Sequence, residues 1–107
     1  MIYTIDEIRK KAVPIAKAFD VDSLSLFGSY ARGEATEESD IDFYFDNGRL
    51  RGLLQHAALI NKLEEAFGCS VDAVSTGINN QEFIKRIKKE GILLYEKIWW
   101  IHDWIMW

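Results

Sequence analysis

Two aspartates spaced one residue apart, Asp40 and Asp42, constrain this sequence more than any other feature. They stand at the start of an aromatic and branched segment that predicts a β-strand over 41–45. Side chains on a strand alternate between its two faces, so both carboxylates are expected to point the same way. Two such anionic groups repel each other unless a cation lies between them. The spacing therefore predicts a site for a hard divalent ion such as Mg²⁺, which takes carboxylate oxygens as ligands.

A turn of small residues precedes the two aspartates. An alternating apolar segment predicts a strand over 23–27, and this strand ends at Gly28 and Ser29. Gly28 removes side-chain bulk, so that phosphate groups can approach the backbone N–H groups, and Ser29 offers a hydroxyl. Arg32 has two equally favoured interpretations, which are a forked contact with phosphate and a salt bridge to an acidic neighbour. The turn and the aspartates together predict a site for a metal and a nucleotide.

Asp72 is the candidate for a third carboxylate. It lies between Val71 and Val74 in a segment that predicts a strand over 69–74, where an aspartate is costly to bury unless it is paired or binds a metal. If this strand neighbours the strand predicted over 41–45, three carboxylates converge, which is enough for two divalent ions. Two-metal sites of this kind catalyse phosphoryl transfer. Asp72 is then expected to help hold the activating metal and to accept the proton of the attacking hydroxyl.

The order of the predicted elements indicates an α/β (α+β) fold, with a small mixed β-sheet flanked by helices. The first helix begins at a capping-box pattern on Thr4 and is expected to kink or split at Pro14. The longest helix is predicted over 50–67, and Gly91 ends a further helix. The apolar run 92–95 is compatible with a strand or a helix. The predicted apolar stripe of the longest helix comprises Leu50, Leu53, Leu54, Ala57, Ile60, Leu63 and Phe67.

Length and composition narrow the function classes. A chain of 107 residues, 49% hydrophobic and 28% charged, suits one compact domain and argues against disorder. The net charge of −4 argues against direct nucleic-acid binding, because the attraction of basic side chains to phosphates contributes most of the non-specific affinity for nucleic acid. Cys69 is the single cysteine, so no internal disulfide forms and a reducing cytoplasm is expected. No apolar run approaches the roughly 20 residues that cross a bilayer, so no membrane association is expected.

Three motifs follow one another along the chain: Gly28-Ser29-Tyr30-Ala31-Arg32-Gly33, Ser39-Asp40-Ile41-Asp42 and Asp72. In this order and spacing they resemble the signature of the minimal nucleotidyltransferases, which include the MNT-type antitoxins of the DNA-polymerase-beta-like superfamily. The resemblance extends over nearly the whole chain and implies a nucleotidyltransferase fold. It also implies Mg²⁺-dependent transfer of a nucleoside monophosphate, usually AMP from ATP, to a hydroxyl with release of pyrophosphate.

The resemblance further implies residue roles and a partner. The implied catalytic and metal-binding residues are Asp40, Asp42 and Asp72, and the implied nucleotide- or phosphate-binding residues are Gly28, Ser29, Arg32 and Ser39. Small family members resemble antitoxins that form a hetero-complex with a helical HEPN-type ribonuclease toxin and can inactivate it by adenylylating a tyrosine. The alternative is a catalytically inactive binding module that neutralises a partner by occlusion. A small-molecule acceptor is less favoured, because 107 residues leave little room for a second domain.

The last segment, 97–107, is expected to follow a nucleotidyltransferase domain over 1–96 without forming a separate domain. It holds all four tryptophans and is not part of the family pattern. Trp100, Trp104 and Trp107 would share one face of a helix. Such a face suits a partner or a second copy, and thus a homo-oligomer, slightly better than packing on the domain itself. A membrane-surface role is the least favoured, because the basic face of such helices is missing.

Overall fold

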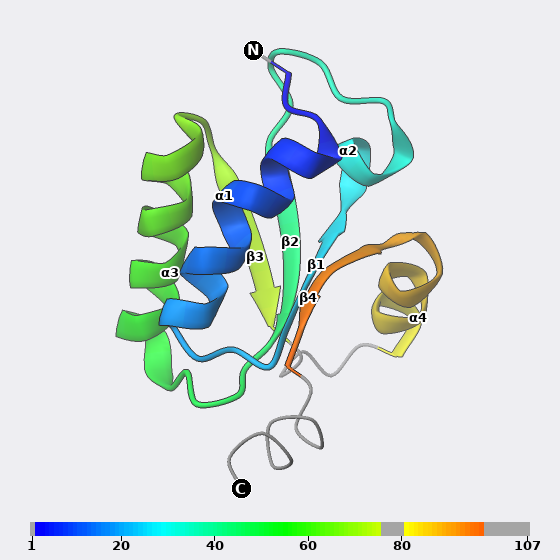
Figure 1. Cartoon of the computed structure of the whole chain (residues 1–107). Helices are drawn as coiled ribbons and strands as arrows, with labels where there is room; N and C mark the ends of the chain where they lie inside the picture. Colours follow the sequence, from blue (N-terminus) through cyan, green and yellow to red (C-terminus); the bar gives the residue numbers. More distant parts are fainter. Residues whose placement is uncertain (1, 76–80, 98–107) are drawn as a thin grey trace, which may run out of the picture.

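The computed structural model describes residues 2–75 and 81–97, and it confirms the predicted mixed architecture (Figure 1). The elements are, in order, α1 (Ile5–Ala18), β1 (Ser23–Phe27), α2 (Gly28–Arg32), β2 (Ile41–Asp46), α3 (Gly52–Phe67), β3 (Val71–Ser75), α4 (Gln81–Glu90) and β4 (Ile92–Glu96). The strands form one sheet in the order β3-β2-β1-β4. β1 is antiparallel to both of its neighbours, whereas β2 and β3 are parallel.

The core lies between the sheet and the pair of helices α1 and α3, which Figure 1 shows side by side. Alternate residues of β2 supply its centre, because Ile41, Phe43 and Phe45 are fully buried. From β1, Leu24 and Leu26 add to the same layer. Asp42 lies between two of these core positions, so its side chain leaves the opposite face of the sheet. The fold thus separates a packed apolar face from a face that carries carboxylates.

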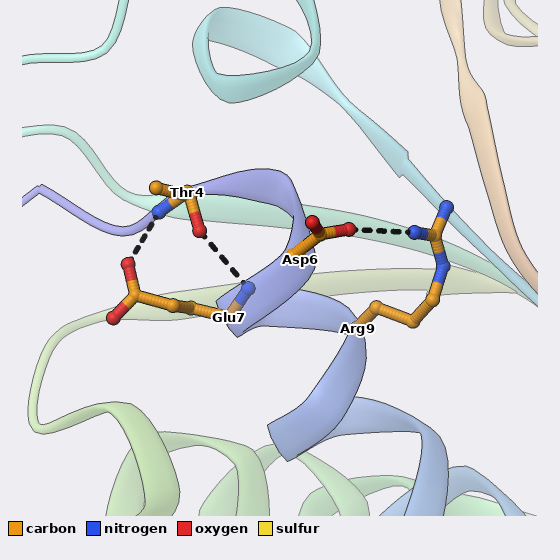
Figure 2. A network of polar contacts seen from close by, with 4 residues as sticks. All are labelled: Thr4, Asp6, Glu7 and Arg9. Carbon is orange, nitrogen blue, oxygen red and sulfur yellow. Dashed lines mark hydrogen bonds and ion pairs between the residues drawn. The ribbon is translucent and has the colours of Figure 1, made fainter.

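The start of α1 is a capping box, as the sequence predicts (Figure 2). Thr4 Oγ1 accepts a hydrogen bond from the backbone N–H of Glu7 at 3.1 Å. The carboxylate of Glu7 accepts the backbone N–H of Thr4 at 2.9 Å, and these bonds hold the pKa of Glu7 below its ordinary value. Beside the box, Arg9 pairs with Asp6 on the exposed surface.

Thr4→Ala should lower the free energy of unfolding by about 1 kcal/mol, because it leaves one helix N–H group without its side-chain acceptor. The matched control is Arg9→Ala, which breaks only an exposed ion pair and should change stability by less than about 0.5 kcal/mol. Urea denaturation of the two variants beside the wild type measures both values. Equal losses would show that the capping box does not stabilise α1.

Three details of the helices and strands differ from the sequence-based expectations. Pro14 does not split the first helix, since α1 runs through it, and Asp40 stands one residue before β2 rather than on it. In α3, Leu53, Leu54 and Ala57 are exposed although they were expected in the apolar stripe. The residues of α3 that are buried are Leu59, Leu63 and Phe67.

The undecided run near the end of the chain is strand β4, which pairs with β1. The tryptophans of the expected C-terminal segment lie outside the described residues, so the domain boundary at 96 and the role of the segment stay predictions. In the part of the chain that the structure describes, none of the helices has the length and apolar character that a bilayer crossing requires.

Candidate active site

The parallel pairing of β2 and β3 brings two of the predicted site residues together. Asp42 and Asp72 are register partners on these adjacent strands, so both side chains leave the sheet on the same face. Asp40 precedes β2 and acts electrostatically on Asp42, as Asp72 does. The expectation that the third strand neighbours the second is confirmed, and two further carboxylates, from two chain segments, act on Asp42.

Gly28 makes room for one of these carboxylates. Its φ is +72°, and a Cβ built there would lie 2.2 Å from Oδ2 of Asp42, far inside van der Waals contact. Phe27, one residue earlier, is the register partner of Asp42 across β1 and β2. The glycine was expected to make space for phosphates. In the structure it makes space for Asp42 itself, so the turn and this aspartate form one packed unit.

The charge of the site concentrates on Asp42. Burial raises the pKa of the Asp42 carboxyl, the negative charges of Asp72 and Asp40 raise it further, and the Arg32 guanidinium lowers it. Asp72 was expected to be costly to bury, but its side chain is exposed. The half-buried carboxylate in the site is Asp42, because Gly28 and the flanking strands surround it. Desolvation therefore acts on a different aspartate from the one that the apolar surroundings in the sequence indicated.

Two predicted phosphate-binding residues make contacts within the site's own loop. Arg32 donates from Nε to a carboxylate oxygen of Glu34 at 3.2 Å, which is the salt bridge given above as one of its two interpretations. The Ser39 hydroxyl accepts a hydrogen bond from the backbone N–H of Thr36 at 2.8 Å and so stabilises the turn just before Asp40. Their roles toward phosphate, like that of Ser29, stay predictions.

Two residues that sequence reasoning did not assign to the site hold β3 in place from α3. Glu64 accepts the backbone N–H of Val71 at 3.3 Å, and His56 donates from Nε2 to the Ala73 carbonyl at 2.7 Å. These contacts flank Asp72 on both sides along the strand. No local sequence pattern predicts these two contacts, because each joins residues that become neighbours only after α3 packs on the sheet.

Arg32→Gln should raise the pKa of Asp42 further, because the guanidinium charge that lowers this pKa would be gone. The matched control is Glu34→Gln, which removes the ion-pair partner of Arg32 but keeps the guanidinium charge. Carboxyl ¹³C NMR titration of the wild type and both variants measures these pKa values. A pKa of Asp42 that does not rise in Arg32→Gln would contradict the assigned role of this charge.

The carboxylate groups of the site are ligands of the type that binds divalent cations. Carboxylate oxygens are the ligands that Mg²⁺ prefers, and a cation among these groups would relieve the repulsion that raises the pKa of Asp42. Within residues 2–75 and 81–97, however, no group of three His, Cys, Asp or Glu side chains is arranged so that it could hold a metal ion by itself. The carboxylates fit Mg²⁺ in their chemistry but not as a preformed three-residue site, and Mg²⁺ usually completes its shell with substrate phosphates and water.

Comparison with known proteins places this site in a family. The model of the family "Polymerase beta, Nucleotidyltransferase" matches residues 10–98. A protein of Methanocaldococcus jannaschii that is named as a protein adenylyltransferase is 38% identical over 92 residues, which is 83% of this chain and 92% of that protein. A solved minimal nucleotidyltransferase is 34% identical with a TM-score of 0.70, over 78% of this chain and 86% of that one.

A more distant structure shares the fold. It contains an MNT antitoxin in complex with a tri-AMPylated HEPN toxin from Shewanella oneidensis. The match has a TM-score of 0.68 at 19% identity and covers 86% of this chain and 72% of that one. The family model and the two relatives above 30% identity show the family, and the more distant structure shows the fold. The chain therefore belongs to the polymerase-beta nucleotidyltransferase family and is a nucleotidyltransferase of the minimal type.

Proposed function

We propose that the chain is a Mg²⁺-dependent antitoxin that transfers AMP from ATP to a tyrosine hydroxyl of a cognate HEPN-type toxin. The observation that carries the proposal is the register pairing of Asp42 with Asp72, beside a glycine that leaves space for the Asp42 carboxylate. The M. jannaschii relative is named as a protein adenylyltransferase, which supports AMP as the transferred group and a protein as the acceptor. The fold shared with an MNT antitoxin supports the HEPN-type partner.

The proposed reaction makes and breaks one bond at the α-phosphorus of ATP. The acceptor oxygen forms a bond to this phosphorus, and the bond from it to the bridging oxygen breaks, so that pyrophosphate leaves with the electron pair. Asp72 accepts the hydroxyl proton, for which its exposed position on β3 is suited. Asp40, Asp42 and Asp72 would hold two Mg²⁺ ions. When bound, such ions lower the pKa of the attacking hydroxyl and neutralise charge on the triphosphate.

The turn after β1 would bind the phosphates. Gly28 leaves its backbone accessible, and Ser29 supplies a hydroxyl donor next to it. Arg32 would exchange its exposed pair with Glu34 for a phosphate oxygen, at little cost because such surface pairs contribute about 1 kcal/mol or less. Ser39 keeps the loop before Asp40 in place and would add a hydroxyl at the same edge.

The test follows each phosphate of ATP separately. The protein, Mg²⁺ and a purified HEPN-type candidate partner are incubated with ATP that carries label on either the α- or the γ-phosphate. The proposal predicts α-label on the partner and γ-label in free pyrophosphate, and no α-label on a partner whose acceptor tyrosine is replaced by Phe. Label from the γ-phosphate on the partner would overturn it in favour of a kinase. Inhibition of the partner's ribonuclease activity without any label would overturn it in favour of occlusion.

A further inference from the structure

A hollow lies between the N-terminal segment and the loop that joins α2 to β2, which Figure 1 shows at the same end of the molecule. Its volume is about 210 Å³, and its apolar lining comes from Ile2, Ile5 and Ala35. A larger hollow of about 530 Å³ adjoins it, since Ile2 and Ala35 line both, and Glu37 and Glu38 form part of its wall. The two hollows make one groove with an apolar end and an acidic end, which we call the N-terminal groove.

The apolar end of the N-terminal groove contains a buried hydroxyl group. Tyr30 is only 5% exposed, and its side chain lines the smaller hollow from α2. Among the residues that the structure describes, the Tyr30 hydroxyl has no hydrogen-bond partner. A buried polar group without a partner costs free energy, and a ligand that brings a hydrogen-bond acceptor removes this cost. The hydroxyl therefore points to a ligand that is not apolar throughout.

The acidic end of the groove carries charge without a counter-charge. Glu37 and Glu38 are exposed, and neither carboxylate forms an ion pair within residues 2–75 and 81–97. Glu34, on the same loop, differs because it pairs with Arg32. Two unpaired carboxylates beside an apolar wall match a lysine or arginine side chain, whose alkyl stem packs on apolar surface while its charged head stays at the rim.

The loop that forms this end is held in shape by its own hydrogen bonds. The Ser39 hydroxyl accepts the backbone N–H of Thr36, the backbone N–H of Ser39 donates to the Thr36 carbonyl at 3.1 Å, and the backbone N–H of Glu38 donates to Thr36 Oγ1 at 3.3 Å. A preformed surface loses less conformational entropy when it binds. Glu38 precedes Asp40 by two residues, which is at most about 7 Å of chain. A ligand in the groove therefore lies beside the active site.

We propose that the N-terminal groove binds the acceptor polypeptide next to its tyrosine, with one apolar side chain in the smaller hollow and one lysine or arginine at Glu37 and Glu38. This inference rests on the proposed function, in which the acceptor is a protein. An apolar cavity of about 150 Å³ accommodates benzene, so a hollow of about 210 Å³ has room for a leucine side chain or an aromatic ring. A backbone carbonyl of the same segment accepts the Tyr30 hydroxyl. A second copy of the chain is the weaker occupant, because its net charge of −4 opposes binding at an acidic groove.

Two short peptides test the groove in the full chain without ATP or a partner protein. Each carries a leucine and a tyrosine, and the two residues between them are lysines in one peptide and glutamates in the other. In ¹⁵N NMR titrations, the lysine peptide should shift the amide signals of residues 35–38 until they saturate, and the glutamate peptide should bind about tenfold more weakly. Equal binding of both peptides, or shifts that spare residues 35–38, would overturn the proposal. Shifts of these signals with protein concentration alone would assign the groove to a second copy and would also overturn it.

Variants of the groove check each end separately. Glu37→Gln/Glu38→Gln should weaken binding of the lysine peptide about fivefold and remove most of its salt dependence. The control Glu65→Gln/Glu90→Gln removes the same charge from two exposed positions elsewhere and should change the affinity by less than about twofold. Tyr30→Phe should weaken binding about fivefold without lowering the melting temperature, because it deletes a buried hydroxyl that has no partner among the described residues. Wild-type affinity in both groove variants would contradict the proposed contacts.

Failure of this inference is distinguishable from failure of the proposed function. Selective binding of the lysine peptide at residues 35–38, without α-label on any HEPN-type partner, would keep the groove and overturn the transfer reaction. Transfer of α-label to such a partner with an unchanged KM in Glu37→Gln/Glu38→Gln would keep the transfer reaction and overturn the groove.

Discussion

Asp42→Asn should lower AMP transfer about a thousand-fold while the protein stays folded. Removing a metal ligand from a phosphoryl-transfer site costs several kcal/mol of transition-state stabilisation, and each factor of ten corresponds to about 1.4 kcal/mol. Asp42 is the carboxylate that faces both Gly28 and Asp72, so its loss affects the whole site. Initial rates of α-label transfer from ATP to the partner measure the effect.

The matched control for this variant is Asp46→Asn. Asp46 lies on the same strand and the same face, four residues further along, where it pairs with Ser23 rather than with a second carboxylate. The control removes the same charge from the same strand, and the transfer rate should stay within about twofold, since surface changes away from a site alter free energies by about 0.5 kcal/mol. Equal rates in the two variants would remove Asp42 from the proposed mechanism.

Asp42→Asn should also make the metal-free protein more stable at neutral pH. The pKa of Asp42 is raised in the folded state, so the folded protein holds this proton more tightly than the unfolded chain does. Stability therefore falls as pH rises from the ordinary carboxyl pKa of 3.8 through the raised value, and the ionised group opposes folding above it. Asp42→Asn removes this term. Its melting temperature should exceed that of the wild type at pH 7, and the difference should shrink below pH 4.

Gly28→Ala should abolish most transfer activity and destabilise the fold more than the backbone conformation alone explains. The new Cβ would lie 2.2 Å from Oδ2 of Asp42, so either the carboxylate or the turn must move. Because φ is +72°, the alanine also incurs the left-handed penalty of about 1 kcal/mol.

Gly33→Ala separates the two causes. Gly33 has a φ of +75°, yet nothing lies within 4 Å of a Cβ built there. Gly33→Ala should lower the free energy of unfolding by about 1 kcal/mol and leave the transfer activity unchanged. Thermal unfolding and label transfer on both variants give the comparison. Equal effects of the two substitutions would show that the contact with Asp42 does not constrain position 28.

The parts of the fold that follow from local pattern could be predicted from the sequence. β1 has the predicted bounds, because alternation over 23–27 matches a strand with one buried face. The neighbouring positions of Asp42 and Asp72 followed from placing two predicted strands side by side, which the pairing of β2 and β3 confirms.

The parts that depend on tertiary packing could not be predicted. Apolar residues occupy more than one face of α3, and only the packed structure decides that Leu59 is buried and that Leu53 and Leu54 are not. The surroundings of Asp72 in the sequence indicated burial, but the flanking valines do not determine what covers the carboxylate side of β3. The steric link between Gly28 and Asp42 joins two strands, so no spacing within one segment reveals it.

The central claim is that Asp40, Asp42 and Asp72 act together as one metal site, and Mn²⁺ tests it most directly. Mn²⁺ replaces Mg²⁺ at carboxylate sites, and its unpaired electrons broaden nearby NMR signals. Carboxyl ¹³C spectra of the full chain with ATP are recorded while Mn²⁺ is added in substoichiometric amounts. The account predicts that these three carboxyl signals broaden first and together, while those of Asp22 and Asp46 stay sharp. Broadening that spares Asp42, or that reaches all surface aspartates equally, would contradict it.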